Sequence, residues 1–265
     1  MKHSIRQRGF ALLIVLWTLA LLALLGTQVL QVSRQDTQLA RNLLDAAALE
    51  MTADGAVQQA IWHVLDSSTA RWSADGLVHL IRIGDARVAV RIDNEADKVN
   101  PGVASPELLQ ALLLQVGADP VSAANLAASI VQWRLGSGSA ARRNTTYLRY
   151  QRAGMDYAPS GAPLASIDEL GSVIGMTQDL LTRLRPHLTV FTDDDPGAAT
   201  RDPTVARALV LAGESEAASE MGEQFVTVTA DARGADNGRI VVRVVVRINR
   251  LPQGSLFKIL AYERL

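Results

Sequence analysis

Clustered acidic side chains are the residues of this sequence whose type and spacing could do chemistry. Asp93, Glu95 and Asp97 fall together on one predicted turn, and a second turn carries the consecutive residues Asp193, Asp194 and Asp195. Calcium takes about 6–8 oxygen ligands, which a compact acidic loop can supply. The sequence therefore allows a calcium site at the second cluster, and the alternative is that both clusters are solvated acidic turns.

Other signatures of catalysis are missing from the sequence. It contains no cysteine, which excludes disulfides, thiolate metal sites and cysteine nucleophiles. No serine occupies a G-x-S-x-G elbow, and the Gly-Ser stretch at residues 136–139 lacks the following G-K-[ST] of a phosphate-binding loop. The formal net charge of -1 gives no global field toward nucleic acid. We therefore expect neither an enzyme nor a nucleic-acid-binding protein.

The N-terminal segment carries the strongest pattern. Basic residues and no acid occupy residues 1–9, and an uncharged, mostly aliphatic run follows from Phe10 to Val32. As a helix this run would reach roughly 34 Å, enough to cross a bilayer core of about 30 Å, and the basic leader places the N-terminus in the cytoplasm. A plain uncleaved anchor and a cleaved signal peptide are the alternatives, although no A-x-A site ends the run.

The segment after this run predicts an amphipathic helix that continues out of the membrane. Residues 33–66 contain no proline, and their apolar residues recur at helical spacing. We expect one side of this helix to bind partner helices through Leu39, Leu43, Ala46, Ala47, Val57 and Ile61.

The rest of the chain predicts strands on both sides of a helical region. Alternating residues predict a hairpin over 77–92 and three strands over 224–232, 239–250 and 255–263. Helices are expected at 106–118 and 119–134, and two more within 166–187, where Ser166 with Glu169 makes a capping box and Thr177 a cap. Residues 134–163 predict an extended surface loop.

The leader resembles the class III leader of type IV pilins and type II secretion pseudopilins. The resemblance rests on Arg8-Gly9 before Phe10 and on the apolar run that flows into an amphipathic helix. It implies that a prepilin peptidase cuts between Gly9 and Phe10 and methylates the new N-terminus. Most members carry Glu at the fifth mature position, where this sequence has Ile14. Its absence is typical of K-type minor pseudopilins, which resemble tip subunits.

Four further segments resemble the K-type pseudopilins of type II secretion, namely residues 93–105, 108–134, 163–192 and 257–265. The resemblance implies partners, the minor pseudopilins I and J, in a tip complex that starts a periplasmic pseudopilus and helps export folded proteins. It implies a single-pass protein of the Gram-negative inner membrane with a periplasmic C-terminal domain. Family members also bind calcium through acids after a tryptophan, and those acids are missing after Trp133.

The expected fold is therefore α+β. A pilin-like unit, with its long N-terminal helix packed on an antiparallel sheet, would hold an inserted all-α domain with helix-hairpin-helix-like units at 116–130 and 170–184. The expected division is a leader (1–9), a transmembrane and amphipathic helix (10–66), a pilin-like α+β domain (67–100 and 222–265) and an inserted helical domain with its connecting loops (101–221). A competence-type pilin that binds DNA through these units, and an anchored periplasmic enzyme, are the alternatives.

Overall fold

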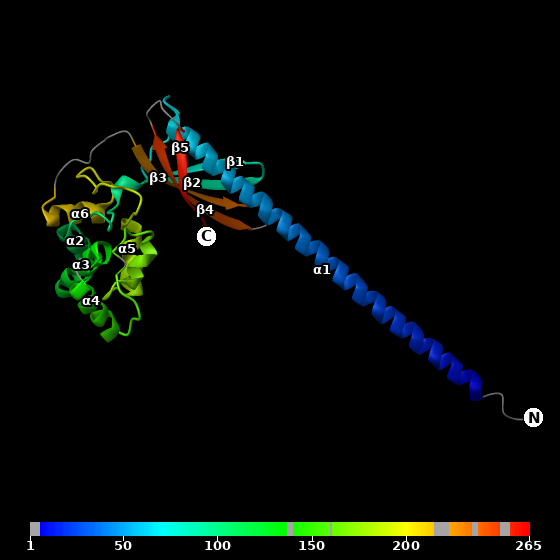
Figure 1. Cartoon of the computed structure of the whole chain (residues 1–265). Coiled ribbons are helices and arrows are strands. Elements are labelled where there is room, and N and C mark those ends of the chain that lie inside the picture. Colours follow the sequence, from blue (N-terminus) through cyan, green and yellow to red (C-terminus); the bar gives the residue numbers. More distant parts are fainter. Residues whose placement is uncertain (1–5, 137–139, 160, 215–222, 235–237, 250–254) are drawn as a thin grey trace, which may run out of the picture.

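A long helix, a sheet and a group of short helices make up the chain (Figure 1). The structure, a computed structural model, describes residues 6–136, 140–159, 161–214, 223–234, 238–249 and 255–265. Within these ranges it describes all side chains except those of residues 6–11, 25–37, 140–143 and 223. The long helix runs across the sheet and extends far beyond it toward the N-terminus, and the short helices gather to one side (Figure 1).

The sheet has five antiparallel strands in the order β1-β2-β3-β4-β5. Their bounds are β1 Val78–Ile83, β2 Ala86–Asn94, β3 Glu223–Arg233, β4 Arg239–Asn249 and β5 Phe257–Arg264. Alternate residues point to opposite faces, so most valines of β2, β3 and β4 gather on one face: Val88, Val90, Val226, Val228, Val242, Val244 and Val246. The predicted hairpin and the three predicted strands are confirmed.

Helix α1, Arg6–Leu65, packs its C-terminal part on the valine face of the sheet. Small and branched residues at helical spacing make this contact, and each is at most 8% exposed: Leu49, Ala53, Ala56, Val57, Ala60, Ile61 and Val64. Strand β5 is also linked to the helix, because the Tyr262 hydroxyl donates to an Asp54 carboxylate oxygen over 2.8 Å and Arg264 pairs with Glu50. The face of the sheet opposite α1 is called the outer face below.

Among the residues whose side chains the structure describes, no helical stretch is both long and apolar enough to cross a membrane.

The helical layer, residues 99–212, has a core of its own, separate from that between α1 and the sheet. Before it comes η1 Glu95–Asp97, and it contains α2 Pro106–Gln115, α3 Pro120–Leu135, α4 Ala140–Arg152, η2 Ile167–Ser172, α5 Gln178–Leu184, η3 Arg185–His187 and α6 Pro203–Ala212. Side-chain caps start four of these helices, at Ser105, Asp119, Thr177 and Asp202. Each cap satisfies backbone N–H groups that have no partner within the helix.

Two local predictions are wrong, and one helix was missed. Residues 134–163 are not an extended loop, because they include α4, whose Tyr150 is 1% exposed and accepts a hydrogen bond from the Ile174 amide over 3.3 Å. Helix α6 was not predicted. Ser166 makes no side-chain cap, since the Glu169 carboxylate instead accepts from the Ala165 amide and the Trp133 indole, at 3.0 and 2.9 Å.

Candidate functional site

The sheet-facing side of α1 includes two residues that the sequence assigned to a partner interface. Val57 and Ile61 are 2% and 1% exposed and lie in the core between helix and sheet. Their side chains are therefore not available to another subunit. The sequence pattern could not separate the chain's own core from a partner interface, because both require an apolar helix face.

The remaining predicted interface residues lie on α1 before the helix reaches the sheet. Leu39 and Leu43 are 59% and 63% exposed, and Ala46 and Ala47 are exposed as well. These four residues are free to contact a neighbouring helix, and the two alanines would permit close approach.

A second apolar stripe on α1 was missed by the sequence analysis. Leu44, Met51 and Trp62 are 70%, 75% and 66% exposed, although each is large and apolar. Their spacings of seven and eleven residues correspond to about two and three helical turns, so they share one side of the helix, facing away from the sheet. Helical spacing was the signal that could have found this stripe.

The leader residues are only partly described. The predicted cleavage site at Gly9 and Phe10, and part of the predicted span of residues 10–32, have side chains outside the described residues. Ile14 is described and is 48% exposed on α1. An apolar side chain here leaves α1 without a carboxylate at the fifth position after the predicted cut.

The acidic residues at positions 193–195 differ in their exposure. Asp193 and Asp194 are exposed, whereas Asp195 is partly buried. In the described part of the chain, no three His, Asp or Glu side chains come together in a group that could hold a metal ion. A calcium site at these three residues therefore stays a prediction.

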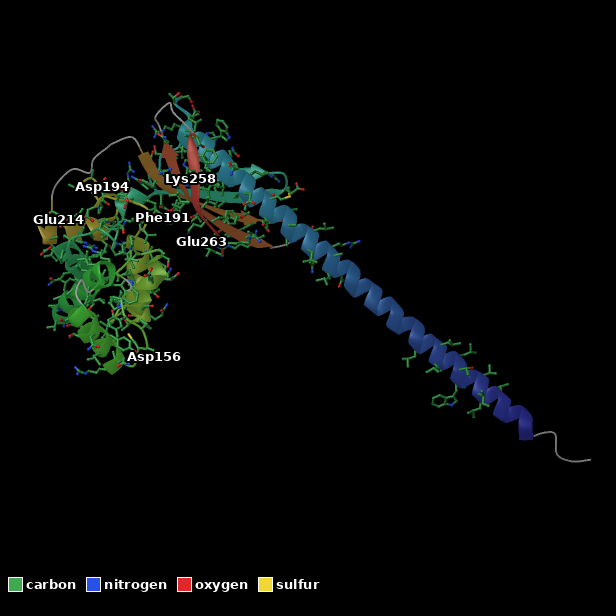
Figure 2. All side chains as sticks on the ribbon, in the orientation of Figure 1. Asp156, Phe191, Asp194, Glu214, Lys258 and Glu263 are labelled. Carbon is green, nitrogen blue, oxygen red and sulfur yellow. The ribbon has the colours of Figure 1, made fainter. Side chains whose placement is uncertain are left out.

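Asp195 is nevertheless an unusual carboxyl. Burial, together with the nearby Glu214 charge, raises its pKa to about 6, while Arg134 opposes the shift. Its Oδ1 atom is buried and has no hydrogen-bond partner within the described chain. Asp194 and Glu214 both lie near the α6 end of the helical layer (Figure 2). An ionised Asp195 therefore destabilises this part of the layer.

We expect Asp195→Asn to raise the melting temperature near neutral pH. Because the folded-state pKa lies above the ordinary value of 3.8, stability is fully present below about pH 4 and is lost as pH rises toward about 6. Asn has no charge at any of these pH values, so the variant does not lose this stability. The difference in melting temperature between variant and wild type, measured from about pH 4 to 7.5, tests this prediction. Asp194→Asn, at an exposed position, is the control. An equal effect of both substitutions, or one independent of pH, would contradict the assignment.

The junction between sheet and helical layer is built on a buried carboxylate. Glu95 is 2% exposed, pairs with Lys98 and accepts a hydrogen bond from the Thr227 hydroxyl over 2.5 Å. A second set of contacts comes from Arg201, whose amide donates to Asp97 over 3.2 Å and whose guanidinium donates to the Ala74 carbonyl over 2.9 Å. Hydrogen bonds thus hold the layer against the sheet.

A cleft of about 720 Å³ opens beside this junction, between the outer face of the sheet and the helical layer. Phe191 from the layer and Glu263 from β5 line its opposite walls, and both are labelled in Figure 2. Charges are paired on each wall, Arg243 with Glu263 over 3.5 Å and Arg185 with Asp168. The cleft therefore has the composition of a contact between two packed units.

Comparison with known proteins agrees with this architecture. The family model for type II secretion system (T2SS), protein K, matches residues 88–193. The type II secretion system protein K of Klebsiella pneumoniae is 25% identical over 214 residues, which are 73% of this chain and 65% of that protein. The chain thus spans about two thirds of the length of this relative.

A solved structure shares the fold. The crystal structure of the GspK-GspI-GspJ complex from the type 2 secretion system of enterotoxigenic Escherichia coli contains a chain that matches with a TM-score of 0.58 and 14% identity. The match covers 88% of this chain and 98% of that one. The family model runs from β2 into the helical layer, so that match includes most of the layer. The comparisons thus show similarity to type II secretion system protein K over residues 88–193 and over 73% of the chain, respectively.

Proposed function

We propose that this chain is a structural, non-enzymatic minor pseudopilin of a type II secretion system that occupies the tip of the periplasmic pseudopilus. The family match over residues 88–193 carries the proposal, because most of it covers the helical layer, which sets this chain apart from a plain helix on a sheet. At the tip the chain would start assembly and cap the fibre that helps export folded proteins through the outer membrane.

Its anchor would be the N-terminal part of α1. In the proposed arrangement a prepilin peptidase cuts between Gly9 and Phe10 and the new N-terminus is methylated. The uncharged run to Val32 then holds the protein in the inner membrane, and the pilin-like unit lies in the periplasm. The support is the basic leader, the length of the run and the continuity of α1 to Leu65.

The partners would be the minor pseudopilins I and J and other pseudopilins of the same system. The resemblance to a chain solved in complex with GspI and GspJ motivates this proposal. Contacts would run through Leu39, Leu43, Ala46 and Ala47 and through the stripe of Leu44, Met51 and Trp62, all of which are exposed on α1. Without a carboxylate at Ile14, the chain lacks a partner for the amine of a subunit above.

Replacing Gly9 by leucine should block maturation. A peptidase that reads the glycine before the apolar run has no substrate when a bulky residue fills that position, so the leader stays attached. Mass spectrometry of the N-terminus in wild-type and Gly9→Leu protein measures this, with His3→Leu as the control inside the leader. A mature wild-type N-terminus near residue 27 or 49 would instead indicate cleavage by signal peptidase and would contradict the pilin assignment.

A further inference from the structure

Four arginines lie side by side across the outer face of the sheet. The strand register places Arg82 opposite Arg87, Arg87 opposite Arg233, and Arg233 opposite Arg239. All four are exposed. Neighbouring strands lie about 4.8 Å apart, so the four backbone positions span roughly 14 Å in one line. We call these residues the arginine row.

The arginine row is only partly neutralised. Asp231 pairs with Arg239 through two contacts of 3.0 Å and lies 3.5 Å from Arg233, and these arginines hold the pKa of Asp231 below its usual range. Neither Arg82 nor Arg87 is paired with an acid among the described side chains, and the nearby turn residue Asp85 is exposed. Like charges directly opposite each other on a sheet are destabilising. The row therefore costs the isolated protein stability.

An apolar border adjoins the arginine row on edge strand β1. Leu80 and Val78 are 82% and 57% exposed, and strand alternation places them on the same face as Arg82. Arginine beside exposed apolar side chains is a composition enriched in protein interfaces. The charge and the border together point to an acidic protein surface as the complement.

The position of the row selects one occupant. Gly234 at the end of β3 and Gly238 before β4 lie against α1 at Leu49, whose side chain is 3.8 Å and 3.5 Å from where a Cβ atom on each glycine would lie. Leu49 is the most N-terminal buried residue among the described side chains of α1. Seventeen residues separate it from Val32, which is about 26 Å along a helix. In the proposed orientation this distance is too long for lipid headgroups to reach the row, but it is wide enough for a small protein domain.

We infer that the arginine row docks an acidic face of the pseudopilin domain seated directly below this chain in the fibre. This inference rests on the proposed function and specifies the chemistry of that partner. Carboxylates of the docked partner would relieve the repulsion between the arginines. The free energy that this repulsion costs the unbound chain would then contribute to binding. Complementary charges of this kind govern partner choice and association rate more than raw affinity.

The test compares Arg87→Glu with Arg207→Glu in the full chain, extracted together with the other pseudopilins of its system in nonionic detergent. Arg207 is an exposed residue of α6, so its reversal changes the net charge equally at a distant surface. We expect Arg87→Glu to recover roughly tenfold less partner, Arg87→Gln an intermediate amount, and Arg207→Glu the wild-type amount. Because the detergent replaces the bilayer, lipid cannot account for the loss.

Thermal melting of the purified chains separates docking from folding. A glutamate at position 87 lies between Arg82 and Arg233, so the melting temperature should not fall below that of the wild type. Recovery by Arg87→Glu equal to the wild type, equal losses from both reversals, or loss accompanied by a lower melting temperature overturns the inference. If the wild-type chain recovers no pseudopilin at all, the proposed function fails as well.

Discussion

Replacing Ile61 by aspartate should unfold the layer formed by α1 and the sheet. Ile61 is 1% exposed and packs among the valines of the sheet, so the substitution removes a buried apolar side chain and places a carboxylate where it has no partner. The two effects together should lower the free energy of unfolding by about 4 kcal/mol or more. Urea denaturation, followed by circular dichroism, measures the change.

The same substitution at Leu43 provides the matched control. Leu43 is 63% exposed on the same helix, beyond the reach of the sheet, so Leu43→Asp should change the free energy of unfolding by less than about 0.5 kcal/mol. It should instead reduce the amount of pseudopilin that co-purifies with the chain. Equal destabilisation by the two substitutions would show that the N-terminal part of α1 folds against the rest of the chain.

Lys98→Met should destabilise the junction between the sheet and the helical layer. The substitution removes the lysine ammonium group. The Glu95 carboxylate, whose side chain is 3% exposed, then keeps the Thr227 hydroxyl as a partner but has no positive charge beside it. Removing one partner of a buried ion pair costs about 3–5 kcal/mol, and the 21% exposure of the Lys98 side chain places the expected loss near about 3 kcal/mol. Denaturation at neutral pH gives the value.

Two further variants locate the cause of that loss. Lys98→Arg keeps the charge and should retain most of the stability. Adding Glu95→Gln to Lys98→Met removes the uncompensated charge and should restore part of what was lost. If the double variant is no more stable than Lys98→Met, the lysine acts through packing of its methylene chain rather than through its charge.

The strands could be predicted from the sequence because alternation is a local signal. In β2, for example, Val88, Val90 and Ile92 are buried while Arg87 and Arg91 are exposed, as the two-residue period requires. Helices α2 and α3 were equally visible, since Ser105 and Asp119 precede a proline and an apolar run.

The helices that were missed owe their presence to different causes. Helix α4 has a polar and arginine-rich sequence, and Tyr150 supports it from the core of the helical layer, a tertiary contact that no local pattern shows. Helix α6 had local signals, because Asp202 caps it, Pro203 starts it and Gly213, with a φ of 76°, ends it.

The candidate interfaces were harder to predict than the elements. An apolar helix face is the same in sequence whether it packs on the chain's own sheet, like Ile61, or remains exposed, like Leu43. The arginine row depends on strand register, which brings Arg87 and Arg233 together although they are far apart in the chain. Register between distant strands follows from long-range packing, so the sequence contains no direct sign of it.

The order of elements along the chain has a consequence for folding during synthesis. Strand β2 ends at Asn94 and its neighbour β3 begins at Glu223, so the sheet closes only after the whole helical layer has been made. The layer draws its core from the continuous segment 99–212 and can pack as soon as that segment has left the ribosome. Until β3, β4 and β5 follow, the apolar face of α1 from Leu49 to Val64 stays uncovered, and the nascent chain is exposed to aggregation during that interval.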